Sequence, residues 1–552
     1  MSLSMDSQCL SFREIPHTTR LFSSFLEDFS QVSKYYAHPP TAEGVLSAAK
    51  EIRLDAGTRR SVVEVLREQN ARFAPGNALE PATARNLDRL AAGAVAIVTG
   101  QQVGLFSGPA YSIYKAVSIL RVADEITRHG TDAVPVFWLA TEDHDLAEVN
   151  HTFFNTRSGL ERYDLAATEA DSGRRMGEIA LGAAIEELVD AAAKSLEGAY
   201  AETVGRALRE SYAPDETYGS AYGKLMARIF AGRGIVFIDP LDARLHRIAA
   251  PVYRRAIEEA APLREALLAR AKELEQAGLH AQVKVTAETT LLFYNVDGRR
   301  QPLRSRDGKY FAGDAEFSAA EIARAAAEHP EFLTPNVLLR PIVQDSLLPT
   351  ATYIGGPSEV AYMAQAQVVY HRVLGRMPAI LPRASFTIVE PPVARFLAKY
   401  DLQFRDILQG AQHVRGAMER KMLPDDLARR FEADEGKLRA MMEAYAAPIE
   451  KLDRTLLDPL KALTDGMLFK FGKLKESVGR ALNLRTGVLD SHERILFDSL
   501  YANRELQERS LSALPFLAAN GGEWLDKLAQ FSAPAGSGEA PACAHQHHVL
   551  FI

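Results

Sequence analysis

Residues 94–109, AVAIVTGQQVGLFSGP, decide the fold of this chain. A short apolar run passes directly into a glycine-bearing loop, and residues from about 110 to 129 follow with the spacing of an amphipathic helix. A second apolar run, AVPVFWLA at 133–140, ends in the acidic sequence TEDHD. Strand, loop, helix and strand in this order predict a βαβ unit with two buried parallel strands and a right-handed crossover.

Further strand-like runs extend this unit toward a larger sheet. The run GIVFIDP at 234–240 carries an aspartate at its carboxyl end, which is where open α/β sheets bind ligands. VLLRPIVQD at 337–345, ATYIGG at 351–356 and AILPRASFTIVE at 379–390 also predict strands, and a helix is expected to start at Ser358. We therefore predict an α/β fold with a parallel sheet at its core.

Two segments inside this core depart from simple alternation of strand and helix. Residues about 155–230 are rich in Ala and Glu and predict helices, and residues about 242–277 return to helix. Residues about 284–312 predict inserted β structure, because Asp-Gly pairs separate strand-like runs there. The expected first domain is residues 1–390, a Rossmann-like core with N-terminal helices and inserted segments at about 155–230 and 242–335.

Beyond about residue 391 the composition shifts to long helices. Apolar residues recur there at seven-residue spacing, which predicts an antiparallel coiled-coil arm over residues 391–508, kinked or broken at Pro448 and Pro459. The last segment, 509–552, has a Gly/Ala/Pro stretch and a strand-like end, and we expect it to return to the core. The apolar positions are Phe431, Leu438, Tyr445 and Leu452 on the outgoing helix and Leu474, Val478 and Leu482 on the returning one.

Composition limits the class of protein. Of 552 residues, 47% are hydrophobic and 24% charged, which is ordinary for a globular protein with a large core. Lys and Arg number 64 against 71 Asp and Glu, so the net charge of −7 offers no basic footprint for nucleic acid. Two cysteines, Cys9 and Cys543, exclude a disulfide framework and fit a reducing compartment. Without an apolar signal region or a run of about 18 apolar residues, we expect a cytoplasmic protein that does not enter the membrane.

The loop after the first strand is the first candidate site. Its glycines allow a ligand to approach the backbone closely, and the free N–H groups at the start of the following helix favour an anion such as a phosphate. It matches neither a Walker loop nor the GxGxxG pattern, and a tight turn that serves only packing is the alternative. The candidate binding residues are Gly100, Gln101, Gln102, Ser107, Gly108, Tyr111 and Lys115.

The acidic cluster after the second strand is the second candidate site. Three carboxylates around one imidazole can bind an amine, hold Mg²⁺ or transfer a proton. The alternative is a solvated loop in which Asp145 caps the next helix. The residues concerned are Glu142, Asp143, His144 and Asp145, followed by Asn150.

A third group of polar residues surrounds the second glycine pair of the core. An arginine here can clamp a carboxylate or phosphate with two hydrogen bonds, although an ordinary salt bridge is the alternative for each arginine. Glu359 can also simply favour the helix dipole. The candidates are Arg340, Gln344, Asp345, Gly355, Gly356, Glu359, Tyr362 and Arg383.

Two other motifs are interpreted as structural. Cys543, His545, His547 and His548 are residue types that bind zinc, but their spacing matches no common zinc motif. On a strand, residues 543, 545 and 547 would share one face, and an edge strand closing on the core is favoured, so no metal site is predicted. The lysines of GKLKES, Lys473 and Lys475, are expected on a solvated helix face.

Four stretches together carry a family resemblance over nearly the whole chain: 98–116, 135–151, 340–365 and 377–390, which include VTGQQVGLFSGPAYSIYKA and TATYIGGPSEVAYMAQ. The chain resembles the bacillithiol biosynthesis cysteine-adding enzyme family. That resemblance implies a ligase that joins L-cysteine to glucosaminyl-malate in the last step of bacillithiol synthesis. It also implies a nucleotidylyltransferase-type core with inserted connecting segments, similar to class I aminoacyl-tRNA synthetases, and a homodimer formed through the coiled coil.

The resemblance places the segment Gly100–Lys115 at the nucleotide loop of that wider group. The paired histidines usual at the helix start are absent here, where the chain reads SGPAY. Amide formation needs an activated carboxyl group, so ATP or another nucleotide is the expected co-substrate, with Mg²⁺ as a candidate ion. In this hypothesis Lys115 and Arg340 stabilise developing negative charge. Neither internal cysteine is expected to act as a nucleophile.

The sugar amine must lose its proton before it attacks, and Asp143, His144 or Asp145 is expected to orient it or accept that proton. One alternative function is another ATP-dependent nucleotidyl- or acyl-transferase acting on a different amine. A second alternative is a non-catalytic dimeric scaffold whose working part is the coiled coil.

Overall fold

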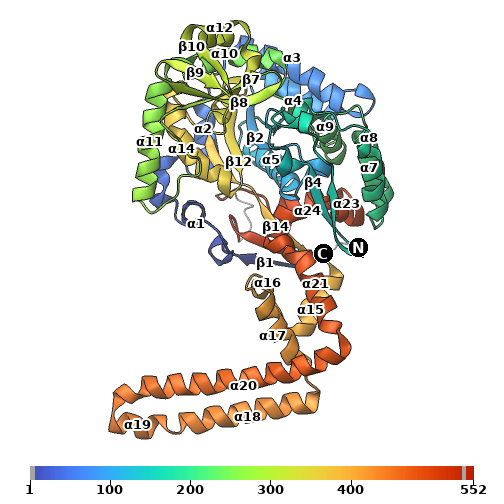
Figure 1. The fold of residues 1–552 in the computed structure, drawn as a ribbon, viewed down its shortest axis with the longest axis vertical. Helices are drawn as coiled ribbons and strands as arrows, with labels where there is room; N and C mark the ends of the chain where they lie inside the picture. The colour runs from blue at the N-terminus through green and yellow to red at the C-terminus, as the bar shows by residue number, and fades with distance from the viewer. Residues whose placement is uncertain (1–5, 537–542) are drawn as a thin grey trace. The chain divides into compact units, whose positions relative to one another are not determined.

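The computed structural model describes residues 6–536 and 543–552, which fall into two compact units (Figure 1). The core unit consists of Cys9–Phe386 together with Glu508–His548. The arm unit is built chiefly of Thr387–Gln507. No helix in the described ranges is both long enough and apolar enough to span a membrane.

A five-stranded parallel sheet forms the centre of the core unit, in the order β13-β12-β2-β3-β6. The first strand along the chain lies in the middle, and later strands add first on one side of it and then on the other. The strand order therefore reverses between β2 and β12, which is the place where sheets of this type bind ligands. The strands are β2 (Val95–Gln101), β3 (Ala133–Leu139), β6 (Val236–Ile238), β12 (Thr350–Gly355) and β13 (Ala379–Pro382).

Helices cover this sheet, which explains why its strands are apolar throughout. All seven residues of β3 and six of the seven of β2 are buried, as expected for parallel strands covered on both faces. Helix α5 packs on β2 and β3, and α24 packs on α5 in turn. The α/β fold and the first βαβ unit are thereby confirmed. The covering helices include α2 (Ala42–Lys50), α3 (Ala56–Phe73), α4 (Pro81–Ala92), α5 (Tyr111–Arg128), α14 (Pro357–Val373) and α24 (Glu523–Gln530).

Two inserted segments interrupt the core, and one of them differs from the prediction. Residues 155–230 were expected to be helical, but the chain first forms a hairpin of β4 (His151–Thr156) and β5 (Gly159–Asp164). Three helices follow it: α7 (Ala184–Ser195), α8 (Ala201–Ser211) and α9 (Tyr218–Ile229). The inserted β structure is confirmed as an antiparallel sheet in the order β10-β9-β8-β7-β11. Its strands are β7 (Thr289–Val296), β8 (Arg299–Arg306), β9 (Lys309–Ala312), β10 (Ala315–Ser318) and β11 (Leu333–Pro335).

Two strand predictions near the third candidate site are corrected. The run 337–345 is not a strand, because Arg340–Leu347 form helix α13 with Pro341 in its first turn, where a missing N–H costs nothing. A short apolar run does not distinguish a buried strand from a buried helix by pattern alone. The run 379–390 is two strands, since β13 ends at Pro382 and β14 (Ser385–Val389) belongs to another sheet.

The chain ends meet in a three-stranded sheet ordered β1-β15-β14, with β1 at Asp6–Leu10 and β15 at His547–Phe551. Cys9 and Cys543 form a disulfide in the core unit, with their Cα atoms 6.1 Å apart. We did not predict this bond, since two cysteines fitted a reducing compartment and 534 residues separate them in sequence. The strand expected over residues 543–547 is also corrected, since β15 begins only at His547.

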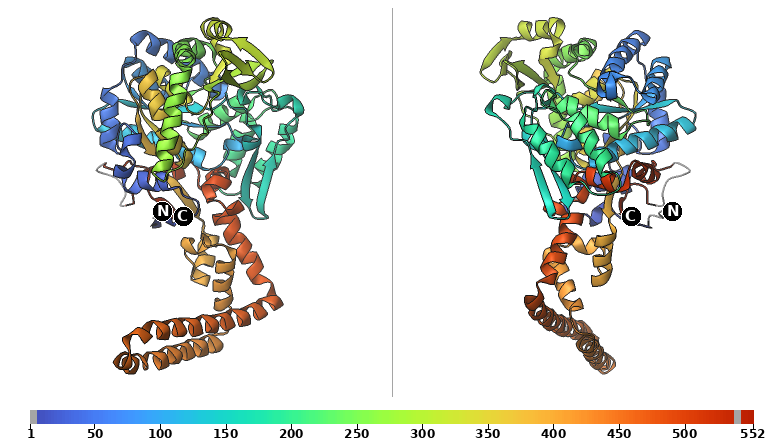
Figure 2. Two further views of the ribbon diagram at one scale, coloured as in Figure 1. Left: turned by 60° about the vertical axis from the view of Figure 1, so that its left-hand side comes forward. Right: turned by 90° about the vertical axis from the view of Figure 1, so that its right-hand side faces the viewer.

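Antiparallel helices α18 and α20 lie side by side and form the long hairpin of the arm unit (Figures 1 and 2). The rings of Phe431 and Phe471 meet between them, with centroids 5.3 Å apart. The chain reverses around the short helix that contains Pro448, close to the break expected from the prolines. The helices are α15 (Pro391–Tyr400), α17 (Ala411–Lys421), α18 (Asp425–Glu443), α19 (Ala446–Leu452), α20 (Leu457–Thr486) and α21 (Val488–Leu500).

Candidate active site

The loop after β2 is tightly held by the rest of the core unit. Phe106, Ser107 and Gly108 all have positive φ, which is unfavourable for the first two residues and requires surrounding structure to maintain it. The backbone N–H of Ala110, at the start of α5, donates to the carbonyl of Leu511 at 2.7 Å. Ser107 is fully buried. The loop is therefore rigid, and part of its expected anion-binding capacity is already taken by the protein.

Lys115 joins the two loops that follow β2 and β12, the strands between which the strand order reverses (the switch point of the sheet). Its ammonium contacts the carbonyl of Gly100 at 2.8 Å, the side-chain oxygen of Gln101 at 2.9 Å and Glu359 Oε2 at 2.6 Å. Burial lowers the pKa of Lys115, and the Glu359 carboxylate opposes that shift. With three acceptors around its three protons, Lys115 holds the ends of β2 and β12 together and has no proton left for a ligand in this arrangement.

Glu359 is fixed just as firmly from the β12 side. Its carboxylate accepts hydrogen bonds from the backbone N–H of Gly356 at 2.7 Å and from the hydroxyl of Tyr353 at 2.5 Å. Burial alone raises the pKa of Glu359, but the Lys115 charge and these hydrogen bonds bring it below its ordinary value. The predicted residues of the first and third candidate sites therefore meet in one buried ion pair.

Arg340 presents the least neutralised charge of this cluster. Its guanidinium donates to the side chains of Gln344 at 3.0 Å and Tyr362 at 3.3 Å. It lies 5.2 Å from the ring centroid of Tyr353 on β12 and 5.9 Å from that of Trp138 on β3, the two strands that flank β2. Within the described ranges, no carboxylate lies within ion-pair distance of it. A carboxylate or phosphate of a substrate would supply the missing counter-charge.

Gln344 and Asp345 continue the hydrogen bonding of Arg340 into the core. Gln344 donates to Asp345 Oδ1 at 2.9 Å, and Tyr370 donates to the other carboxylate oxygen at 2.6 Å. Burial raises the pKa of Asp345. Because its oxygens are occupied inside the protein, Asp345 is placed to orient Gln344 rather than to bind a ligand.

The acidic cluster after β3 is organised by Arg300, which we did not predict. A guanidinium nitrogen of this buried arginine lies 2.9 Å from His144 Nδ1, and Asp143 Oδ1 lies 3.5 Å from it. Its remaining nitrogens donate to the Thr334 hydroxyl and the Pro335 carbonyl. Arg300 lies on β8 of the inserted sheet, 156 residues away from His144 in sequence. The one feature that could have indicated its role is its inward-facing position on that strand.

Asp143 is held ionised by its surroundings. Although burial raises its pKa, the Arg300 charge and hydrogen bonds from Gln102 and from the backbone N–H of His144 hold the pKa of Asp143 well below its ordinary value. Gln102 donates to Asp143 at 2.9 Å and to Glu148 at 2.6 Å, so it links the first candidate loop to the second. Asp143 thus offers a permanent negative charge, which suits binding of an ammonium group.

Glu142 forms a separate buried pair with His246 on α10 (Ala243–Glu258). Glu142 Oε1 lies 3.3 Å from His246 Nε2, and the Tyr253 hydroxyl lies 3.3 Å from His246 Nδ1. Burial raises the pKa of Glu142 to about 7 and lowers the pKa of His246 to about 4. At neutral pH the pair is therefore uncharged or singly negative and can take up or release one proton. His246 carried no signal in the sequence, since it lies within an ordinary helical pattern.

The remaining predicted residues have other partners. Arg383 forms a buried ion pair with Glu508 at 2.6 Å and lies over the Tyr111 ring, 5.2 Å from its centroid. Asn150 donates to Asp164 and to the Leu165 carbonyl, which anchors the β4–β5 hairpin. Asp145 is exposed and makes no capping hydrogen bond to α6 (Leu146–Val149). No group of three or more potential metal ligands occurs in the parts of the chain that the structure describes.

Sheet order, switch-point residues and helical hairpin together define a Rossmann-like α/β protein with a coiled-coil domain. The chain belongs to the bacillithiol biosynthesis BshC family, whose N-terminal Rossmann-like domain matches residues 5–384 and whose C-terminal coiled-coil domain matches residues 386–536. The family resemblance inferred from the sequence motifs is thereby confirmed.

Curated relatives extend over nearly the whole chain. A protein of Koribacter versatilis named "Putative cysteine ligase BshC" is 41% identical over 525 residues, covering 95% of this chain and 97% of the relative. Proteins with the same name from Solibacter usitatus and Salinibacter ruber are 35% and 31% identical, and cover 94% and 92% of this chain and 96% and 93% of their own length.

Proposed function

We propose that this chain is a carbon–nitrogen ligase that joins the carboxyl group of L-cysteine to the amine of glucosaminyl-malate, the last step of bacillithiol synthesis. Family membership and the names of the relatives support this assignment. The observation that carries it furthest is Arg340, a guanidinium without a carboxylate partner among the described residues at the switch point of the sheet. An anionic substrate is what such a group binds best.

Activation of the cysteine carboxylate is the first chemical requirement, and a nucleotide such as ATP would supply the adenylyl or phosphoryl group. Arg340 binds the anion that reacts and stabilises the negative charge that develops on it. The rigid loops on either side, joined by Lys115 and Glu359, keep that guanidinium and the end of β2 in a fixed arrangement. Mg²⁺ would enter with the phosphates, since the described residues form no group of three metal ligands.

Proton removal from the sugar amine is the second requirement. Asp143, which stays ionised, attracts the ammonium group, and Glu142 accepts its proton. A carboxylate whose pKa lies near 7 is suited to this role, because it is substantially deprotonated yet still basic at neutral pH. His246 Nε2 lies 3.3 Å from Glu142 and positions that carboxylate.

The arm unit supports a homodimer. Leu452, Leu463, Phe469 and Leu474 are large apolar residues of the hairpin, and each exposes more than half of its side chain, with Leu452 at 82%. Large apolar side chains exposed on one helical hairpin are suited to burial against a second copy of the chain. Sedimentation of the chain and of a Leu452→Glu, Phe469→Glu variant would distinguish a dimer held by this surface from a monomer.

The assignment is tested by incubating the pure protein with glucosaminyl-malate, L-cysteine, Mg²⁺ and one nucleoside triphosphate at a time. Mass spectrometry should detect bacillithiol with one nucleotide and not without it. Release of AMP indicates adenylyl activation, and release of ADP indicates phosphoryl activation. Absence of the amide with every nucleotide, from protein that is folded and dimeric, would contradict the proposal.

A further inference from the structure

The disulfide between Cys9 and Cys543 lies beside a histidine and a pocket that the proposed reaction does not use. Sγ of Cys9 is 3.8 Å from Nδ1 of His548, which is within the range of a hydrogen bond to sulfur. Burial lowers the pKa of His548 to about 4, so the imidazole is neutral at neutral pH. All three residues belong to the core unit.

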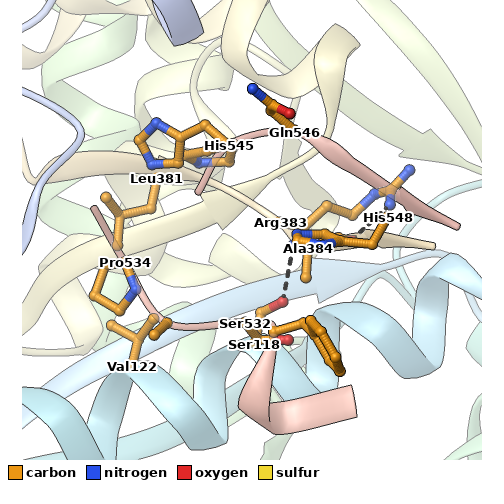
Figure 3. Close-up of a pocket in the computed structure, with 13 residues that line it drawn as sticks. Ser118, Val122, Leu381, Arg383, Ala384, Ser532, Pro534, His545, Gln546 and His548 are labelled. Atoms are coloured by element: carbon orange, nitrogen blue, oxygen red, sulfur yellow. Dashed lines mark hydrogen bonds between the residues drawn. The ribbon is translucent and has the colours of Figure 1, made fainter. Parts of the chain in front are cut away.

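His548 also lines a small pocket of about 30 Å³, which has room for a water molecule or two and not for a whole small molecule (Figure 3). Its walls come from α5, from the end of β13 and from the C-terminal segment. Figure 3 shows His545, Gln546 and His548 on the C-terminal segment and Ser118 and Val122 on α5. Cys9 and Cys543 are themselves only partly buried, so a small thiol can approach the disulfide from solvent.

We propose that the Cys9–Cys543 disulfide is an exchangeable bond, and that a low-molecular-weight thiol reaches its partly exposed sulfurs from solvent. The thiolate of the small molecule attacks Sγ of Cys543 and forms a mixed disulfide, while the bond to Cys9 breaks and its electron pair leaves with Cys9 Sγ. His548 Nδ1–H stabilises this departing thiolate by a hydrogen bond, and a thiolate that is stabilised leaves faster. The Cys9 thiolate then takes a proton from water.

A second small thiol completes the exchange. It attacks the mixed disulfide on Cys543, which releases the small molecule as its own disulfide and leaves both cysteines reduced. Two thiols are oxidised and one protein disulfide is reduced, so electrons balance. The identity of the thiol in the cell rests on the proposed function, whose substrate and product both carry a thiol group. The exchange itself does not depend on ligase activity.

The bond lies next to a buried network that reaches the candidate active site. Nδ1 of His547 is 2.7 Å from the Ser385 hydroxyl, which donates to Glu508, and Glu508 holds Arg383 over Tyr111. Opening the disulfide releases residue 543 from β1, only four residues before His547. Exchange is thus placed to loosen the contact that keeps Arg383 in position.

The test uses the full-length protein purified without reductant and treated with L-cysteine, quenched with N-ethylmaleimide and mapped by peptide mass spectrometry. We expect intact disulfide before treatment, then a cysteinyl group on Cys543 together with alkylated Cys9, and finally two alkylated cysteines. His548→Gln should slow the first step by about three- to tenfold. His38→Gln replaces another buried histidine of the core unit that neither lines the pocket nor contacts a cysteine, and should leave the rate unchanged.

Three results would overturn the proposal: free thiols in protein equilibrated with cystine, a disulfide that resists L-cysteine until the protein unfolds, or an adduct on Cys9 instead of Cys543. Should His548→Gln fail to fold, Cys9→Ser provides the second test, since its Cys543 should form a lasting adduct with cystine. No turnover is measured in these experiments. A protein that exchanges but makes no amide would refute the ligase proposal alone, and the reverse pattern would refute only the exchange.

Discussion

Nδ1 of His144 accepts a hydrogen bond from the Arg300 guanidinium at 2.9 Å, because an arginine can only donate. This contact places the proton of the neutral imidazole on Nε2 and leaves no free lone pair on the ring. Of the three residues expected to handle the amine proton, His144 is therefore arranged as a hydrogen-bond donor. Asp143 is arranged as a fixed negative charge. We therefore propose Glu142 as the proton acceptor.

Two replacements of Arg300 should distinguish its role in orienting His144 from its contribution to the stability of the fold. Arg300→Lys keeps the charge but loses the planar group that contacts His144, Thr334 and Pro335 at once, so kcat/KM should fall by about 10- to 100-fold with little change in Tm. Arg300→Met also leaves Asp143 without its cation and should lower the free energy of unfolding by about 2–4 kcal/mol. Steady-state kinetics and urea titration measure the two effects. Equal activity of Arg300→Lys and the unaltered protein would argue against the assigned role.

Activity should rise with pH as Glu142 loses its proton. Since burial raises the pKa of Glu142 to about 7, kcat/KM should have an ascending limb centred near pH 7. Glu142→Gln should abolish this limb and lower kcat by about 10²- to 10⁴-fold. His246→Gln should shift the midpoint of the limb while keeping much of kcat, as expected of a residue that positions the base. A limb that persists in Glu142→Gln would assign the proton acceptor to another group.

The same carboxyl group should make stability depend on pH. With a folded-state pKa of about 7 against an ordinary 4.5, the folded chain keeps a proton that the unfolded chain releases. This contribution is fully present below pH 4.5 and is lost as the pH rises through 7. Glu142→Gln avoids that loss and should gain up to about 3 kcal/mol on the unaltered protein between pH 4.5 and 8. Urea titrations of both proteins at pH 4.5 and pH 8 test this prediction. It would be contradicted if the two proteins differed in unfolding free energy by the same amount at both pH values. His246 is present in both proteins, so its opposite dependence largely cancels.

Replacing either of two arginines of the core unit with methionine should have different consequences, for stability in one case and for substrate binding in the other. Arg383 neutralises the buried Glu508, so Arg383→Met should lower the free energy of unfolding by about 3–5 kcal/mol, and Glu508→Gln in the same chain should restore part of it. Arg340 has no such partner among the described residues, so Arg340→Met should change stability by less than about 1 kcal/mol. Its KM for the anionic substrate should instead rise by about tenfold or more. A large stability loss in Arg340→Met would show that its charge serves the fold.

Local patterns predicted the parts of the fold that depend on local sequence. The apolar runs at β2, β3, β6 and β12 are recognisable because strands covered on both faces must be apolar throughout. Helix α13 was missed because its apolar residues form a short run that fits a strand equally well.

The candidate site was predictable only where its residues follow strand ends. Lys115 and Glu359 belong to segments that parallel strands bring together, so their meeting follows from the topology. Arg300 enters from an inserted sheet and His246 from a later helix, and no spacing relates either to residues 142–144. The Cys9–Cys543 bond depends in the same way on pairing of the chain ends.

The most direct test of the ligase proposal follows oxygen. L-Cysteine labelled with ¹⁸O in both carboxylate oxygens is supplied with glucosaminyl-malate, Mg²⁺ and the active nucleotide. Mass spectrometry then measures the ¹⁸O content of each product. Activation followed by attack of the amine predicts one ¹⁸O in the bacillithiol amide and one in the released AMP or phosphate. Amide formed without label in any nucleotide product, or no amide at all, would contradict the account.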